Sequence, residues 1–115
     1  MKVIQVGLIG FGTVGQGLAE VLLTQQKRLP KRTGMSIVLA GIADKSGKAL
    51  PERFQNIPLV TDGRELIKDP NIDIIVELIG GIEPAKTLVL EAIAAGKHVV
   101  TANKALLSQE GKDIF

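Results

Sequence analysis

Runs of apolar residues recur along the chain and predict four strands of a buried sheet. These are residues 3–9, 36–43, 72–79 and 98–101. The first run is interrupted only by Gln5 and Gly7. A strand that is apolar almost throughout is typical of a parallel sheet with both faces covered. A shorter run at residues 59–61 predicts one more, short strand.

Apolar residues with a helical period follow the first strand. They recur at positions i, i+4, i+7 and i+8, which lie on one face of a helix. These residues are Val14, Leu18, Val21 and Leu22. The helix is expected to run to about Arg28, because Pro30 and Gly34 break the pattern.

Three further helices are expected later in the chain. Asp62 is placed to cap a short helix that ends near Lys68. Pro84 suits the first position of a longer helix, and Gly96 suits its end. The buried face of this longer helix is expected to comprise Leu88, Val89, Ala92, Ile93 and Ala95. The last helix is expected to begin near Lys104.

The alternation of strands and helices predicts the fold class. Such alternation gives a parallel sheet with helices on both faces, and right-handed crossovers make it half of a doubly wound sheet. We therefore expect a Rossmann-like, three-layer α/β/α domain over residues 1–115. Residues 113–115 still read as helix, and a complete dinucleotide fold usually has more strands. We expect this domain to be truncated at its C-terminal end.

Four glycines lie within residues 10–17, directly after the first strand. Glycine is costly to order, so such a cluster needs a reason. The spacing Gly10-x-Gly12-x-x-Gly15 matches the dinucleotide fingerprint, and it stands in the right context, between a buried strand and a helix. Gly10 allows a tight turn, Gly12 lets a pyrophosphate approach the backbone, and Gly15 lets the helix pack closely. The alternative is a strand-to-helix turn without a ligand.

The start of this helix is suited to an anion. The N–H groups of Thr13, Val14 and Gly15 are free at the positive end of the helix dipole, and the Thr13 hydroxyl is a further donor. The acidic residue expected after the second strand is Asp44, whose carboxylate can bind the adenosine ribose. This favours NAD over NADP, although Lys45 could hold the 2′-phosphate of NADP. A loop or capping role for Asp44 is a third possibility.

Composition and charge argue against several classes of function. A net charge of +2 is too small for a nucleic-acid footprint, and the chain has three Phe and no Trp or Tyr for base stacking. One His and no Cys argue against a transition-metal site. The absence of cysteine fits a reducing cytoplasm. The N-terminal apolar run is too short to cross a membrane.

Two polar segments follow the later strands, at the edge where open α/β sheets bind ligands. Gly80 and Gly81 follow the third strand and would let a flat ring approach the backbone. Lys104 follows the fourth strand, near Thr101 and Asn103. From position alone, Lys104 is more often a solvated lysine than a functional one. We interpret Glu77 as structural, and His98 as a core or sheet-edge residue within its strand.

Three segments together resemble a known family. They read GLIGFGTVGQG, VELIGGIEPA and GKHVVTANKALL, in this order. In sequence and separation they are similar to the N-terminal nucleotide-binding domain of homoserine dehydrogenase. The resemblance covers essentially the whole chain, and the last segment is the most specific. Many sugar and inositol dehydrogenases share Gly-Lys-His-Val but continue with Cys-Glu-Lys-Pro.

The resemblance implies the reversible, NAD(P)-dependent conversion of homoserine to aspartate 4-semialdehyde, a step towards threonine, methionine and isoleucine. It implies that the glycine loop, with Phe11, holds the pyrophosphate. It also implies that the later strand ends lie beside the nicotinamide, with Lys104 in the active site. The residues expected at the nicotinamide end are Ile79, Gly80, Gly81, Thr101, Asn103 and Lys104.

The same resemblance implies that other parts of the enzyme lie outside this chain. In the family, a second lysine, the substrate-binding carboxylates and the dimerisation segment belong to a substrate domain. We therefore expect this chain to bind cofactor without turning over substrate, and the parent enzyme to be a homo-oligomer. The fragment is expected to self-associate through exposed sheet edge. Two alternatives remain: a different NAD(P) oxidoreductase of a small hydroxy or amino acid, and a non-catalytic nucleotide-sensing module.

Overall fold

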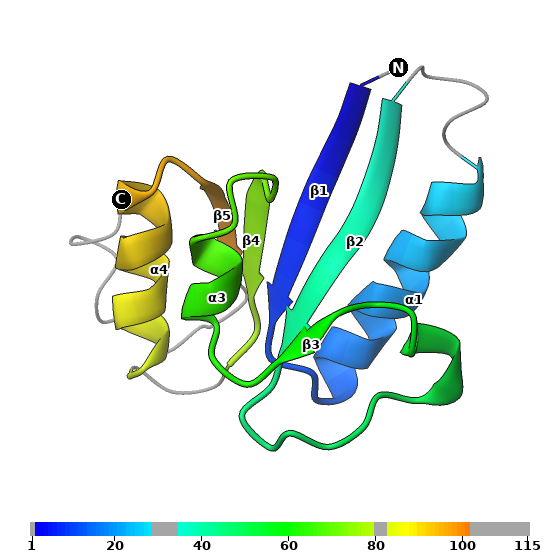
Figure 1. The fold of residues 1–115 in the computed structure, drawn as a ribbon, viewed down its shortest axis with the longest axis horizontal. Helices are drawn as coiled ribbons and strands as arrows, with labels where there is room; N and C mark the ends of the chain where they lie inside the picture. The colour runs from blue at the N-terminus through cyan, green and yellow to red at the C-terminus, as the bar shows by residue number, and fades with distance from the viewer. Residues whose placement is uncertain (1, 29–34, 80–82, 102–115) are drawn as a thin grey trace.

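The structure, a computed structural model, describes residues 2–28, 35–79 and 83–101. Its sheet has five parallel strands in the order β3-β2-β1-β4-β5 (Figure 1). In chain order, the strands are β1 (Lys2–Ile9), β2 (Met35–Ala43), β3 (Leu59–Val60), β4 (Ile74–Glu77) and β5 (His98–Thr101). The helices are α1 (Thr13–Arg28), the 3-10 turn η1 (Glu52–Phe54), α3 (Arg64–Ile67) and α4 (Ala85–Ala94).

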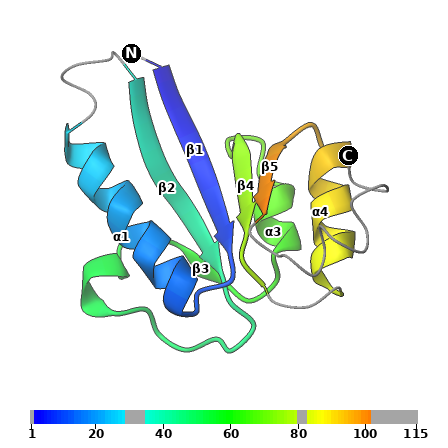
Figure 2. The same ribbon diagram turned by 180° about the vertical axis from the view of Figure 1, so that it is seen from behind.

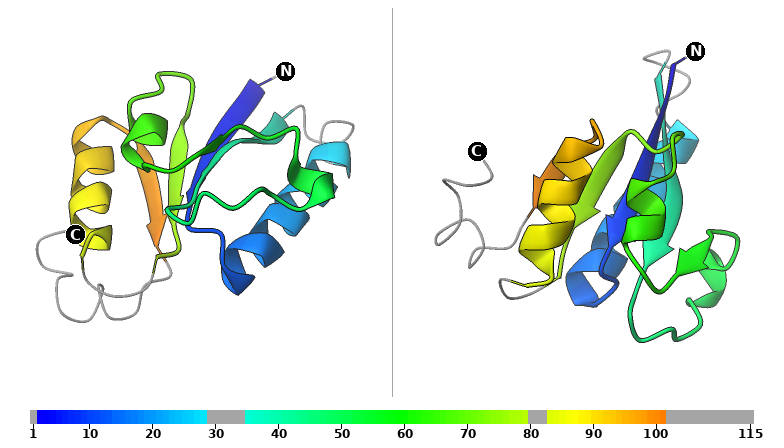
Figure 3. Two further views of the ribbon diagram at one scale, coloured as in Figure 1. Left: turned by 60° about the horizontal axis from the view of Figure 1, so that its bottom comes forward. Right: turned by 60° about the vertical axis from the view of Figure 1, so that its left-hand side comes forward.

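The helices form a layer on each face of the sheet. α1 lies on one face, along β1 and β2, whereas α3 and α4 lie on the other face (Figures 1 and 2). The view from the side in Figure 3 shows the sheet between these layers. The predicted three-layer α/β/α arrangement with a parallel, Rossmann-like sheet is confirmed.

The strand order reverses at β1. The chain moves outward from β1 through β2 to β3, and then returns to the other side of β1 with β4 and β5. A reversal of this kind leaves a crevice at the carboxyl ends of the strands, because the connections leave β1 and β4 in opposite directions. The topology therefore predicts that a ligand binds at the carboxyl ends of β1 and β4.

Apolar side chains leave β1 on both faces, as predicted for a strand in a parallel sheet. Leu8 packs in the core under α1, together with Leu39 of β2 and Ala19 of the helix. Its neighbour Ile9 packs in the opposite core, under α3 and α4, with Leu66. Both side chains of β1 are almost completely buried.

A β-bulge in β2 changes which side chains reach each core. Val6 of β1 pairs with Leu39 but Gly7 pairs with Gly41, so Ala40 is an extra residue. As a result Leu39 and Ile42, three positions apart, share the core under α1. A Cβ on Gly41 would lie 2.6 Å from Leu66 Cδ2, so this glycine allows α3 to approach the sheet.

α1 ends at Arg28, as predicted, but its predicted buried face is only partly right, because Leu18 and Leu22 pack against the core whereas the two valines do not. Val14 and Val21 are 65% and 53% exposed, whereas Gly15 and Ala19 are buried. Leu18, Leu22 and Leu23 pack beside Ala19. At the start of the helix the loop leaves no room for a side chain at Gly15, where a Cβ would lie 2.5 Å from Gly10 O.

The predicted face of α4 is also partly wrong. Ala85, Leu88, Val89 and Ala92 are buried, but Ile93 is 41% exposed and Ala95 is exposed. Pro84 is the N-cap rather than the first helical residue, so the helix begins one residue later than predicted, at Ala85. The helix ends as predicted: Gly96 has φ +82°, its N–H donates to Ile93 O, and Lys97 N–H donates to Ala92 O.

Three smaller expectations have different outcomes. β4 (Ile74–Glu77) is shorter than the predicted run 72–79, because the turn at Asp69 and Asn71 extends to Ile72. The short strand near residue 59 is confirmed as β3. The helix expected near Lys104 lies outside the described residues. Among the residues that the structure describes, no helix has the length and apolar character needed to span a bilayer.

Candidate functional site

A cleft of about 680 Å³ opens at the carboxyl ends of the strands. Its walls come from the loop after β1, the segments after β2 and β3, the end of β4 and the first turns of α4. The lining residues are Ile9, Gly10, Phe11, Gly12, Ala43, Asp44, Lys45, Thr61, Asp62, Gly63, Arg64, Leu78, Ile79, Pro84 and Leu88. The cleft therefore lies where the reversal of strand order predicts a ligand site.

Two glycines of the loop after β1 are required by its geometry. Gly10 has φ +102°, and its N–H donates to Ala43 O at 2.8 Å. A Cβ on Gly10 would lie 3.1 Å from the backbone carbon of Leu78. A Cβ on Gly15 would lie only 2.5 Å from Gly10 O. Any side chain at these positions would push the loop, β4 or α1 apart.

Gly12 differs from these two glycines. A Cβ built on Gly12 has no heavy atom within 4 Å, and Gly12 is exposed. The backbone here is open to a ligand, and the fold does not need the glycine for packing. Of the three predicted roles, close packing at Gly15 and a tight turn at Gly10 match the geometry. The third role, the approach of a pyrophosphate to the backbone at Gly12, depends on a ligand.

The first turn of α1 presents unpaired amides beside this loop. The first hydrogen bond of the helix runs from Gln16 N–H to Gly12 O, at 2.9 Å. The N–H groups of Thr13, Val14 and Gly15 precede it and have no partner within the helix. These three residues border the cleft at the loop but are not among its lining residues.

Phe11 is held by the core. Its ring is almost buried and meets the Phe54 ring edge-on, with centroids 5.4 Å apart and planes at 85°. Edge-to-face packing of this kind adds stability beyond burial alone. Phe11 therefore anchors the loop between Gly10 and Gly12, and it is one of the residues that line the cleft.

Asp44 and Lys45 lie at the end of β2 and line the same cleft. The N–H of Asp44 donates to Val60 O at 2.9 Å, which extends the pairing of β2 with β3. Asp44 Oδ1 accepts a hydrogen bond of 3.2 Å from Ser46 N–H. The side chain is half-buried, whereas Lys45 is exposed. The structure thus brings both residues together with the glycine loop, as the sequence predicts.

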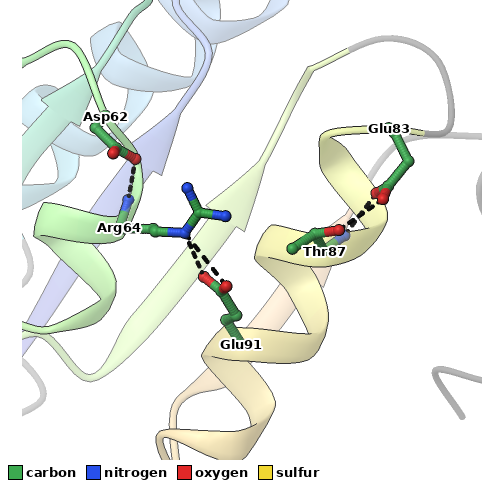
Figure 4. Close-up of polar contacts among 5 residues, drawn as sticks. All are labelled: Asp62, Arg64, Glu83, Thr87 and Glu91. Atoms are coloured by element: carbon green, nitrogen blue, oxygen red, sulfur yellow. Dashed lines mark hydrogen bonds and ion pairs between the residues drawn. The ribbon is translucent and has the colours of Figure 1, made fainter.

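The turn between β3 and α3 contributes lining residues that the sequence analysis did not identify as part of the site. Asp62 Oδ1 accepts from Arg64 N–H at 2.9 Å, and Arg64 Nε donates to both carboxylate oxygens of Glu91, at 2.9 and 3.2 Å (Figure 4). The hydrogen bond to Glu91 and its charge raise the pKa of Arg64. The N-cap of α3 is Gly63 rather than the predicted Asp62, although Asp62 still accepts from the first amide of the helix. Because β3 has only two residues, the sequence contains no sign that the turn after it lies at the edge of the sheet where ligands bind.

At the other end of the cleft, a buried carboxylate joins two strand ends. Glu77 is completely buried. Its Oε2 accepts from Ile79 N–H and its Oε1 accepts from the Thr101 hydroxyl, each at 2.6 Å. These contacts fit the structural role expected for Glu77. Ile79 lines the cleft, and Thr101 is connected to it through Glu77. Gly80, Gly81, Asn103 and Lys104 lie outside the described residues.

The first turn of α4 carries its own acidic partner. Glu83 Oε1 accepts from Thr87 N–H at 2.8 Å, and Oε2 accepts from the Thr87 hydroxyl at 2.6 Å (Figure 4). The hydrogen bond from the Thr87 hydroxyl, followed by that from the backbone N–H, lowers the pKa of Glu83. A negative side chain thus occupies the positive end of this helix.

His98 and the expectation about metal sites remain to be compared with the structure. His98 is exposed on β5, an outer strand of the described sheet, so the sheet-edge interpretation holds. Within the ranges that the structure describes, no group of three or more His, Asp or Glu side chains is placed to hold a metal ion.

Comparison with known proteins gives one consistent family. Residues 10–115 match the family model described as "Homoserine dehydrogenase, NAD binding domain". Homoserine dehydrogenase of Methylobacillus glycogenes is 47% identical over 109 residues, which cover 94% of this chain and 26% of that enzyme. The Synechocystis enzyme of the same name is 41% identical over 115 residues, covering 97% of this chain and 26% of that enzyme.

Solved structures agree in fold and sequence. The crystal structure of homoserine dehydrogenase from S. aureus at pH 8.5 has a TM-score of 0.91 and 34% identity, covering 99% of this chain and 29% of that one. The enzyme from Thiobacillus denitrificans has a TM-score of 0.84 and 44% identity, covering all of this chain and 27% of that one.

This chain spans about a quarter of the length of these curated relatives. Neither a different oxidoreductase nor a nucleotide-sensing module is favoured by relatives that carry the name homoserine dehydrogenase. The family model begins at the first glycine of the loop and continues to the last residue, through every segment that lines the cleft after Ile9. The chain accordingly belongs to the family of NAD-binding domains of homoserine dehydrogenases.

Proposed function

We propose that this chain binds NAD or NADP in the cleft and forms the cofactor domain of a homoserine dehydrogenase. The observation that carries the proposal is the loop after β1. Gly10 and Gly15 are required by its geometry, whereas Gly12 faces open space beside the unpaired amides of α1. A fold that excludes side chains at two positions and leaves the third open fits a pyrophosphate. We also propose that residues 1–115 form a single domain.

Each predicted site residue has a role in this proposal. The backbone of the loop and the first turn of α1 hold the pyrophosphate, and the Thr13 hydroxyl adds a donor. Asp44 accepts hydrogen bonds from the adenosine ribose, which favours NAD. Lys45 is the nearby cation that would accompany a 2′-phosphate if NADP were preferred. The residues proposed for the nicotinamide end are Ile79, Gly80, Gly81, Thr101, Asn103 and Lys104.

The proposed reaction converts the hydroxyl carbon of homoserine into the aldehyde of aspartate 4-semialdehyde. The bound nicotinamide supplies a hydride acceptor for this oxidation. Lys104 takes the hydroxyl proton, and for this it must be neutral, so the pKa of Lys104 must be lower than the ordinary lysine value. The positive charge of an oxidised nicotinamide bound nearby would act in that direction. In the reverse reaction the protonated lysine polarises the aldehyde oxygen.

We propose that complete turnover needs regions of the longer relatives that lie outside the quarter of their length matched by this chain. A second lysine, substrate-binding carboxylates and a dimerisation segment are the groups that the family resemblance implies. The chain alone is expected to bind cofactor and the whole enzyme to be a homo-oligomer. We propose a cytoplasmic location because a chain without cysteine fits a reducing compartment.

A matched pair of glycine variants tests the proposal. Gly12→Val places a branched side chain where the phosphate would approach, and Gly17→Val places the same side chain on the exposed side of α1. A Cβ at either position has no heavy atom within 4 Å, so the fold accepts both. In titration calorimetry with NAD⁺ and NADP⁺, Gly12→Val should raise Kd at least about tenfold, since displaced charge-assisted bonds cost roughly 1.5–3 kcal/mol.

The Gly17→Val control should bind like the wild type. Equal binding by Gly12→Val and the wild type would show that the loop does not hold the cofactor. Absence of binding by the wild-type chain itself would contradict the proposed function. The preferred cofactor is the one with the lower Kd for the wild type.

A further inference from the structure

Arg64 lies at the rim of the cleft. It is the first residue of α3, directly after the turn that follows β3, and it lines the cleft together with Asp62 and Gly63. β3 pairs with β2, whose end carries Asp44. If Asp44 binds the adenosine ribose, as in the proposed function on which this inference rests, Arg64 is on the side of the cleft where the base attached to that ribose lies.

The guanidinium of Arg64 is held in one orientation. Its Nε donates to both oxygens of Glu91 on α4, and its backbone N–H donates to Asp62 Oδ1. In Figure 4 the two Nη atoms are turned away from Glu91. Among the described residues, the hydrogen bonds of the guanidinium are made by Nε, and neither Nη atom donates one. A planar group fixed through one nitrogen leaves its face and outer edge available to a ligand.

The surroundings of Arg64 favour a neutral, flat ligand over a second phosphate. The carboxylates of Glu91 and Asp62 lie beside it and offset its charge. The nearby part of the cleft is apolar, with Pro84 and Leu88 from α4. An arginine plane next to apolar side chains is suited to a heteroaromatic ring, because guanidinium is weakly hydrated and stacks on π-faces.

We propose that Arg64 recognises the adenine ring of the dinucleotide by stacking its guanidinium plane on the base. Glu91 is then a positioning residue, which holds the plane parallel to the base through Nε. The contact contributes to the affinity for any ligand that carries the adenosine half, and it does not distinguish NAD from NADP.

Titration calorimetry of Arg64→Ala with NAD⁺, NADP⁺ and ADP-ribose tests this proposal. ADP-ribose keeps the adenine and the pyrophosphate but lacks the nicotinamide. We expect Kd for all three ligands to rise by the same factor, roughly threefold to thirtyfold, as for the loss of a desolvated cation–π contact. Arg64→Lys keeps the charge without the plane and should recover only part of the affinity, and Glu91→Gln should give a smaller loss.

Arg53→Ala is the matched control. Arg53 is also an exposed arginine with a carboxylate partner, Glu20 at 2.7 Å, but it does not line this cleft. Its replacement should leave all three Kd values unchanged. A loss confined to NADP⁺ would assign Arg64 to the 2′-phosphate, and a loss absent for ADP-ribose would assign it to the nicotinamide end. Either result, or no change at all, would overturn the proposal.

Failure of this inference is separable from failure of the proposed function. If the wild type binds no dinucleotide, the proposed function is wrong. If the wild type binds and Arg64→Ala binds equally well, only the adenine contact is wrong. Thermal unfolding followed by circular dichroism checks that each variant keeps the fold. Little change is expected for exposed side chains such as these, since surface ion pairs contribute little to stability.

Discussion

Single residues in the cleft are constrained for different reasons. Gly15 is fixed by packing, because a Cβ there would meet Gly10 O at 2.5 Å. Gly12 is unconstrained by the fold, so a requirement for glycine at that position would come from a ligand. Glu77 is constrained by burial, since its carboxylate takes one hydrogen bond from β5 and another from the chain after β4. Of these three positions, Gly12 is therefore the one where a side chain can be introduced without harm to folding.

The preference between the two cofactors is tested at Asp44. Asp44→Ser removes the charge that would repel a 2′-phosphate and leaves a hydroxyl that can still accept from Ser46 N–H. We expect the ratio of affinities, NADPH over NADH, to rise by about fivefold to tenfold, since one exposed like-charge repulsion amounts to on the order of 1 kcal/mol. Fluorescence titration with both reduced cofactors measures this ratio.

Asp62→Ser is the control for this prediction. Asp62 is a second carboxylate in the same cleft, but it follows β3, whereas the proposed ribose ligand Asp44 follows β2. Its replacement should change the ratio much less than Asp44→Ser does. An unchanged ratio in Asp44→Ser would remove Asp44 from the ribose site.

At the scale of elements, α4 shows how a helix end can be sensitive to pH. Glu83 is exposed, and its folded-state pKa is lowered from the ordinary value of 4.5 by its bonds to Thr87. A lowered pKa means that the ionised form stabilises the fold. This contribution is complete above pH 4.5 and is lost as the pH falls through the lower, folded-state pKa.

We therefore expect Glu83→Gln to lose stability relative to the wild type near pH 7 and to converge with it in acid, below the folded-state pKa. Urea unfolding at several pH values, followed by circular dichroism, measures the difference. Glu52→Gln is a suitable control, because Glu52 lies on η1, away from α4. A difference between Glu83→Gln and the wild type that is constant with pH would contradict the assigned hydrogen bonds.

The elements also show how far the sequence predicts the structure. β1, β2 and α1 were predictable to within one residue, because long apolar runs and a glycine loop leave few alternatives. The buried side of α1 was only partly predictable, because apolar periodicity correctly points to Leu18 and Leu22. It also points to the exposed Val14 and Val21, and it misses the buried Gly15 and Ala19. The ion pair between Arg64 and Glu91 joins residues far apart in the chain, so no local sequence pattern predicts it.

At the scale of the whole molecule, the described sheet has outer strands that are accessible. β5 is one of them, and its Val100 side chain is 55% exposed. Unpaired strand edges and exposed apolar side chains favour association between copies. We expect the apparent mass of this chain in multi-angle light scattering to rise with concentration, and Val100→Lys to weaken that rise. A constant monomer mass across the concentration range would contradict this.

Two of the helices that begin at the cleft, α1 and α4, differ in what they offer an anion. Among the residues that the structure describes, the amides at the start of α1 have no partner, whereas the start of α4 already holds the carboxylate of Glu83. The protein carries its own anion at one of the two positive ends, so a ligand phosphate meets competition there and none at α1. A molecule with two chemically distinct halves joined by phosphates would then have one place for its centre, and the cleft residues that meet its two halves, such as Asp44 after β2, would set its direction.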